Sequence, residues 1–201
     1  MTLATTGGQT LPKILTPIAP RPRPTEFLRA WFAGCPADHL LELRAFHAET
    51  AAVHQAFFTL DAIDELYGQA CHLVETHDCY FGAAPRVRPR GRKQDVTMTP
   101  GLWCDLDFKR FEGGEAEALR KLADFPLPPA WIIASGGGFH LYWKLTTPVK
   151  ADADFEQRLK GLVRALNADP AATDRCRVLR IPGTFTRKYP DCQVRIVAWP
   201  S

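Results

Sequence analysis

Two aspartates separated by one residue interrupt an apolar run, Leu102-Trp103-Cys104-Asp105-Leu106-Asp107-Phe108. Alternate side chains of a β-strand point to opposite faces, so Asp105 and Asp107 would share a face, about 6–7 Å apart along the strand. Carboxylates at that spacing suit one or two hard cations such as Mg²⁺ or Mn²⁺, and without a cation the paired charges would cost stability. A solvated edge strand remains an alternative, because Asp-x-Asp is a common pattern.

A glycine-rich segment lies downstream, Ser135-Gly136-Gly137-Gly138-Phe139-His140-Leu141-Tyr142-Trp143-Lys144. With the apolar residues before it, the segment predicts a β-hairpin with a glycine turn. Three glycines exceed what a turn needs, and they would let the backbone approach a ligand and aim N–H groups at phosphate oxygens. Alternation places His140, Tyr142 and Lys144 on one face. A flexible hairpin with a surface histidine is the other interpretation.

A basic segment follows, over residues 174–188. Arg180 lies on the polar face of a predicted strand at 177–181, and a Pro-Gly turn can bring Lys188 back towards it. Two such cations suit a polyphosphate or a nucleic-acid backbone. Asp174 could supply a third carboxylate, or it could be a turn residue or an ion-pair partner of a neighbouring arginine.

An upstream loop carries five cations in eight residues and no acid: Arg86, Arg88, Arg90, Arg92 and Lys93. This loop concentrates more charge than the net +3 of the whole chain. A mobile basic loop suits neutralisation of nucleic-acid phosphates, whereas a solvated loop is the alternative. Trp103 is a candidate stacking surface, although an isolated aromatic is more often simply packed.

Periodicity predicts the elements that position these residues. Apolar residues at helical spacing indicate helices from Asp61 to about 74 and over 152–167, the second capped by Asp152, and Thr25 can cap a short helix. Further elements are a helix at about 114–124 and strands at 39–46, 79–83, 102–108, 130–134, 139–145, 177–181 and 193–199. An α+β, or mixed α/β, fold follows.

Composition excludes several classes of protein. The 201 residues, 46% apolar and 23% charged, are typical of a soluble globular protein. Six cysteines without a Cys-x-x-Cys pair indicate reduced thiols, and we expect no zinc because the cluster of Cys71, His72, His77 and Cys79 fits no zinc template well. No leader or long apolar run is present, which predicts a cytoplasmic protein with no membrane partner.

The three polar segments, in this order, resemble the archaeo-eukaryotic primase (AEP) superfamily, and most closely the primase-polymerase domains of plasmids, phages and other mobile elements. The resemblance covers about residues 40–199 and includes a looser match at Tyr80-Phe81-Gly82-Ala83-Ala84-Pro85-Arg86. It depends on Asp-x-Asp, Ser-Gly-Gly-Gly-x-His-x-Tyr-Trp and Arg-Ile-Pro-Gly-Thr at these separations. Gly138 stands where the superfamily often has a serine.

The resemblance implies two apposed α/β modules, the second like an RNA-recognition domain, with the active site in the cleft between them. After a proline-rich extended arm at 1–24, the modules would span about 25–100 and about 101–201. Asp105, Asp107 and Asp174 would be catalytic and metal-binding. Nucleotide-binding residues would be His140, Arg180, Lys188, Ser135, Gly136 and Gly138, and Arg86, Arg88, Arg90, Arg92 and Lys93 would bind nucleic acid.

The implied activity is template-directed DNA or RNA priming and polymerisation. Two-metal nucleotidyl transfer, with Mg²⁺ or Mn²⁺, would run from an NTP or dNTP to a 3′-hydroxyl or an initiating nucleotide. Expected partners are a single-stranded DNA template or primer-template, and a helicase or helical primase segment further along a longer protein.

Two other functions remain open. A replication-initiation module that binds nucleic acid with little synthesis is disfavoured, because unmetallated aspartates would repel phosphates. A metal-dependent phosphodiesterase is disfavoured because a hydrolase has no use for a triphosphate site.

Overall fold

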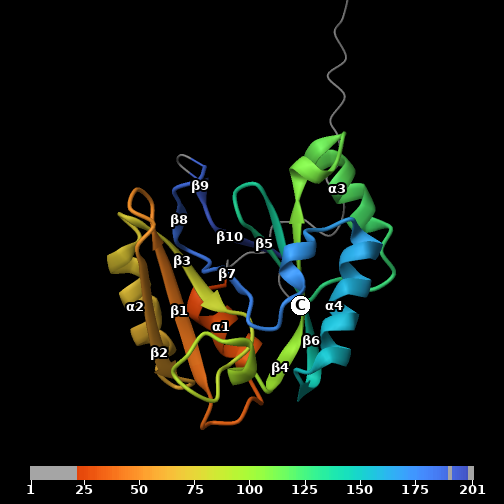
Figure 1. Ribbon diagram of the computed structural model, residues 1–201. Helices are drawn as coiled ribbons and strands as arrows, with labels where there is room; N and C mark the ends of the chain where they lie inside the picture. Colours follow the sequence, from red (N-terminus) through yellow and green to blue (C-terminus); the bar gives the residue numbers. More distant parts are fainter. Residues whose placement is uncertain (1–21, 190–191, 199–201) are drawn as a thin grey trace, which may run out of the picture.

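The computed structural model describes residues 22–189 and 192–198. Most of the predicted arm at 1–24 therefore lies outside the described residues. Two four-stranded antiparallel sheets lie side by side, with helices packed against them (Figure 1). This mixed α+β architecture is the predicted fold class.

The first sheet has the strand order β2-β1-β3-β7. Its strands are β1 (Leu40–His47), β2 (Val53–Thr59), β3 (His77–Gly82) and β7 (Val178–Arg180). Helix α2 (Ile63–Leu73) packs on one face, where Leu41, Leu43 and Ala45 of β1 are buried. The opposite face, called the polar face below, carries Arg44 and Gln55 as well as Phe46 and Val53, and the basic loop at 85–95 packs against it.

The second sheet has the strand order β10-β5-β6-β4. Its strands are β4 (Met98–Asp107), β5 (Trp131–Ala134), β6 (Gly138–Lys150) and β10 (Arg195–Ala198). Helices α3 (Gly114–Ala123) and α4 (Ala153–Leu166) cover the outer face, shown on the right in Figure 1, and bury Leu106 and Leu141. Trp103, Asp105 and His140 point the other way, towards the first sheet, because side chains alternate along a strand.

Helix α1 (Pro24–Phe32) joins the two sheets. The Phe27 ring makes edge-on contacts with Phe81 of the first sheet and with Trp131 and Tyr142 of the second. Burial of these four aromatic side chains in one cluster provides a large apolar contact area. One apolar core therefore spans both sheets.

The first turn of α1 departs from the sequence prediction. Thr25 is not the cap, because Pro24 takes the first helical position and the Arg23 N–H donates to Glu26 at 2.8 Å. At the other end, Lys144 Nζ donates to the carbonyls of Trp31 and Ala33, each at 2.7 Å. Lys144 thus satisfies carbonyls at the end of α1 and is not among the residues that line the pocket described below.

Most predicted elements are found within a few residues of their expected bounds. Asp152 caps α4 by accepting the Phe155 N–H, as predicted. Strand β2 was not predicted, and the predicted last strand is divided into β9 (Cys192–Gln193) and β10. The remaining elements are β8 (Phe185–Thr186) and the 3₁₀ turns η2 (Lys93–Asp95), η3 (Phe108–Arg110) and η4 (Pro170–Thr173).

The division into modules at about residue 100 stays a prediction. The first sheet takes its fourth strand, β7, from residues 178–180, so the chain returns to the N-terminal half late in the sequence. Among the described helices, none has the length and apolarity that a membrane span requires.

Candidate active site

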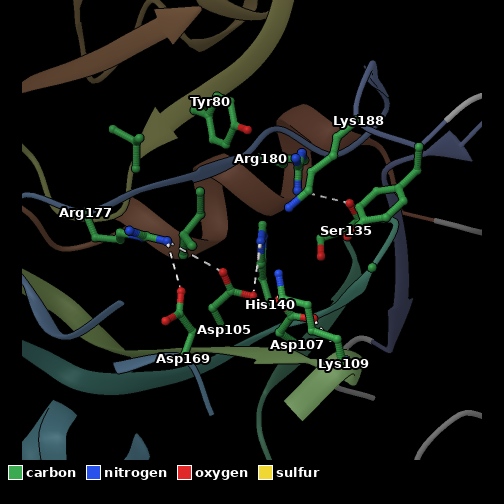
Figure 2. A pocket seen from close by; sticks show the side chains of 14 residues that line it. Tyr80, Asp105, Asp107, Lys109, Ser135, His140, Asp169, Arg177, Arg180 and Lys188 are labelled. Carbon is green, nitrogen blue, oxygen red and sulfur yellow. Dashed lines mark hydrogen bonds and ion pairs between the residues drawn. The ribbon is translucent and has the colours of Figure 1, made fainter. Parts of the chain in front are cut away.

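A pocket of about 220 Å³ lies where the two sheets meet (Figure 2). Strands β3 and β7 contribute one wall, and β4 and β6 contribute the other. Its charged lining comprises the acids Asp105, Asp107 and Asp169 and the cations Lys109, Arg177, Arg180 and Lys188, with Tyr80, Ser135, His140 and Tyr189 between them. Opposite charges are therefore concentrated in one small volume.

Strand β4 delivers Asp105 and Asp107 to the pocket from the same face. Asp105 is opposite His140 in the β4–β6 register, with 3.9 Å between Oδ1 and Nε2, which is too long for a hydrogen bond. Asp107 ends the strand: Oδ1 accepts the Lys109 N–H at 3.1 Å, and Oδ2 lies 2.9 Å from Lys109 Nζ. The turn after β4 therefore holds the Asp107 carboxylate in place.

Asp169 is the third acid of the pocket, and it was not predicted. Helix α4 ends where Asn167 adopts the left-handed conformation, after which the chain turns back towards β4. The Asp169 N–H then donates to the Asp105 carbonyl at 2.8 Å. An aspartate that follows a helix and precedes a proline is typical of a capping residue, and Asp169 does cap η4. The sequence around Asp169 therefore did not distinguish an active-site acid from an ordinary cap.

Asp174, the predicted third acid, does not line the pocket. Its exposed side chain accepts the Cys176 N–H at 3.0 Å, so it acts as the turn residue that was its alternative interpretation. Arg177 is the residue of this turn that reaches the pocket. Its Nη2 lies 3.7 Å from both Asp105 Oδ2 and Asp169 Oδ2 (Figure 2).

Burial raises the pKa of Asp105 to about 6, Arg177 counteracts the rise, and the charges of Asp169 and Asp107 add to it. An ionised Asp105 is thus short of compensating positive charge, which a hard cation at these oxygens would supply. The donor set fits Mg²⁺ or Mn²⁺ in chemistry. In the part of the chain that the structure describes, however, no three acids, histidines or cysteines already converge on one point. Arg177 and Lys109 form ion pairs with these carboxylates instead.

His140 is 2% exposed, and its Nδ1 is buried without a hydrogen-bond partner among the described residues. Burial lowers the pKa of His140 to about 3, with further lowering by Arg180 and Arg177, so the imidazole is neutral at pH 7. A neutral imidazole offers one N–H and one acceptor. His140 can therefore hydrogen-bond a ligand, but it adds no positive charge.

Arg180 and Lys188 form the basic wall of the pocket, as the sequence suggested. The Arg180 guanidinium stacks over the Tyr80 ring at 5.4 Å, and its Nη1 donates to the Ser135 carbonyl at 3.3 Å. Its Nε lies 3.7 Å from Asp78, beyond hydrogen-bonding distance. Arg180 is thus held in place while part of its donor capacity stays unused.

The glycine turn differs from its prediction. Ser135 and Gly137 line the pocket, whereas Gly136 and Gly138 do not. A side chain at Gly138 would overlap the Leu106 carbonyl, and one at Gly137 would overlap the Tyr189 hydroxyl. Close packing within the protein therefore explains why glycine is required at Gly137 and Gly138. The Ser135 hydroxyl donates a hydrogen bond to the Gly138 carbonyl at 3.1 Å.

Two residues that were predicted to contact nucleic acid, Arg86 and Trp103, are buried in the protein instead. Arg86 is fully buried, and its Nε donates to Glu42 at 2.8 Å, so it is not available to nucleic acid. Trp103 is also fully buried and donates to the Ala172 carbonyl at 3.0 Å, so it is packed and offers no stacking surface. Arg88, Arg90, Arg92 and Lys93 are exposed, although Lys93 pairs with Glu156 at 2.7 Å.

No protein-family model matches the chain, and no curated protein sequence matches it either. Solved structures, in contrast, do match the chain. The AEP domain of the cyanophage S-2L primase-polymerase aligns with a TM-score of 0.58 and 15% identity, over 79% of this chain and 80% of that one. The catalytic domain of primase RepB' in complex with initiator DNA aligns with the same TM-score and identity, over 89% and 86%.

The sequence identity is too low to carry more than the fold. Each alignment nevertheless spans most of both chains. The fold implied by the sequence motifs is confirmed: the chain has the fold of archaeo-eukaryotic primase catalytic domains.

Proposed function

We propose that the pocket is the active site of a template-directed primase-polymerase, which transfers a nucleotidyl group from an NTP or dNTP to a 3′-hydroxyl or an initiating nucleotide. The observation that carries the proposal is the opposition of three carboxylates and four cations across about 220 Å³. A triphosphate with bound cations needs both kinds of charge within one site. The fold shared with primase catalytic domains supports it.

The acids Asp105, Asp107 and Asp169 would hold the divalent cations. Mg²⁺ or Mn²⁺ bound there would neutralise charge on the triphosphate and lower the pKa of the attacking hydroxyl. Binding requires Lys109 to leave Asp107 and Arg177 to leave Asp105 and Asp169. Both side chains would then be free to pair with phosphate oxygens beside the acids.

The opposite wall would hold the triphosphate. Arg180 and Lys188 suit its non-bridging oxygens, and the planar guanidinium can bind two of them at once. His140, being neutral, would donate one hydrogen bond to a phosphate oxygen. In the reaction a bond forms between the 3′-oxygen and the α-phosphorus while the bond to pyrophosphate breaks, so positioning and charge neutralisation are what the residues must provide.

The decisive test is nucleotide incorporation on primed and unprimed single-stranded templates with labelled nucleotides and Mg²⁺ or Mn²⁺. The wild-type protein should extend the primer, and the Asp105→Ala/Asp107→Ala variant should not. Circular dichroism of the variant controls for folding. Shortening of the template without extension would favour the phosphodiesterase, and binding of intact template without extension would favour the initiation module.

A further inference from the structure

We propose that the polar face of the first sheet is the track on which a single-stranded template lies as it enters the pocket. Exposed Arg88, Arg90 and Arg92 would hold its phosphates, and Phe46 and Tyr80 would provide aromatic surfaces for its bases. That the strand is a template rests on the proposed function. Binding of a single strand to this face does not.

One row of cross-strand neighbours links the outer edge of the sheet to the pocket. In the strand register Gln55 pairs with Arg44, Arg44 with Tyr80, and Tyr80 with Arg180, so all four share one face. Three interstrand steps of about 4.8 Å make a row about 14 Å long. This length matches about four nucleotides of a stacked strand at about 3.4 Å each. The row ends in the pocket, which Tyr80 and Arg180 line.

A groove of about 490 Å³ lies at the other end of the row. Its apolar floor is the register pair Phe46 and Val53, and the Val53 side chain is 55% exposed. Arg90 and Arg92 lie along its rim. The Phe46 and Tyr80 rings meet edge to face, 5.4 Å apart, so this aromatic pair is shared by the groove and the pocket. Aromatic and apolar surface beneath a basic rim is typical of single-strand binding sites.

The loop that carries the rim contacts the sheet at several points. Its first arginine, Arg86, is anchored by the buried ion pair with Glu42. Gly91 lies so close to the Arg44 and Gln55 side chains that a methyl group there would overlap both. The Val87 N–H also donates across the loop to the Asp95 carbonyl at 2.8 Å. A loop whose backbone is already held in place loses little backbone entropy when its cations bind phosphates.

The acids on this face do not offset the basic rim. Glu42 is fully buried, and it pairs with both Arg86 and Arg44. Asp78 accepts the Arg187 N–H at 3.0 Å and lies near Arg180. The exposed rim arginines therefore present positive charge without a neighbouring exposed carboxylate among the groove-lining residues. A polyanionic strand fits this charge pattern.

The test is fluorescence anisotropy with a labelled oligothymidylate about 12 nucleotides long, within the usual range of single-strand site sizes. Arg90→Ala/Arg92→Ala should weaken binding and make the slope of log affinity against log salt shallower by about 1.4, because two phosphate contacts are lost. Arg120→Ala/Lys121→Ala on α3 removes the same charge from the far side of the second sheet and should leave the slope unchanged.

The aromatic surface has its own signature. Phe46→Leu keeps apolar packing but removes the ring, and it should weaken oligothymidylate binding by about 5-fold to about 150-fold, with the salt slope unchanged. The proposed track would be refuted if Arg90→Ala/Arg92→Ala and Arg120→Ala/Lys121→Ala changed the salt slope equally. It would also be refuted if Phe46→Leu bound the oligothymidylate with wild-type affinity. A protein that binds along this face but synthesises nothing would refute the proposed function and retain the track.

Discussion

The buried carboxylate of Asp105 makes a pH-dependent contribution to stability that can be worked out from its surroundings. The side chain is 20% exposed and shares the pocket with Asp107 and Asp169. Burial and these neighbouring acids raise its pKa from 3.8 to about 6, against the opposing effect of Arg177. Replacement of the carboxylate by an amide in Asp105→Asn keeps the shape and removes the charge.

The sign and size of the effect follow from the raised pKa. Well below its unfolded pKa of 3.8 the carboxyl is protonated in both the folded and the unfolded protein, so the variant gains nothing. Between about pH 4 and about pH 6 the unfolded protein ionises this carboxyl while the folded protein keeps it protonated, so the stability of the wild type falls relative to the variant across this window and levels off above about pH 6. A pKa rise from 3.8 to about 6 corresponds to at most about 3 kcal/mol in favour of Asp105→Asn at about pH 8.

Urea unfolding in the presence of a chelator measures this difference across the pH range. Asp124→Asn, which alters an exposed aspartate at the end of α3, controls for simple loss of surface charge. Addition of Mg²⁺ should stabilise the wild type more than Asp105→Asn, because a cation that binds only the folded state adds to its stability. A stability difference that does not vary with pH, or a variant less stable than the wild type at about pH 8, would refute this electrostatic reasoning.

Two further predictions concern the framework. Glu42→Gln should lower the free energy of unfolding by about 3–5 kcal/mol in urea titrations, because it leaves the buried Arg86 without its counter-ion. An unchanged unfolding midpoint would show that the ion pair is dispensable. Gly138→Ala should lower the thermal midpoint, since the methyl group would overlap the Leu106 carbonyl, whereas Gly161→Ala, with open space around it in α4, should be neutral or stabilising. Equal midpoints for the two alanine variants would contradict the packing explanation.

Local periodicity was enough to predict the strand that carries Asp105 and Asp107 and the hairpin that carries His140. It was not enough to choose the third acid. Asp169 reaches the pocket only because α4 ends at Asn167 and the chain returns to β4, and this path depends on tertiary packing. Asp174 has the more suggestive position in the sequence, yet its side chain closes a local turn.

Burial of charged groups was equally hard to predict. Arg86 belongs to a basic run in the sequence, but its partner Glu42 is 44 residues away and meets it only in the folded protein. Strand β2 was missed because it is an edge strand in which no residue is fully buried, so its apolar pattern is weak. Non-local pairing therefore decided the position of Arg86, whereas β2 pairs with the neighbouring strand β1 through a short hairpin.

The most direct measurement of the central claim is the rate of metal-dependent nucleotide incorporation by Asp169→Asn beside Asp174→Asn. The two substitutions are chemically identical, and only the first lies in the pocket. We expect Asp169→Asn to lose at least about 100-fold in rate, as removal of one group that stabilises a charged transition state commonly does, and Asp174→Asn to stay close to the wild type. Loss of incorporation in Asp174→Asn with an active Asp169→Asn would contradict the assignment of this pocket as the active site.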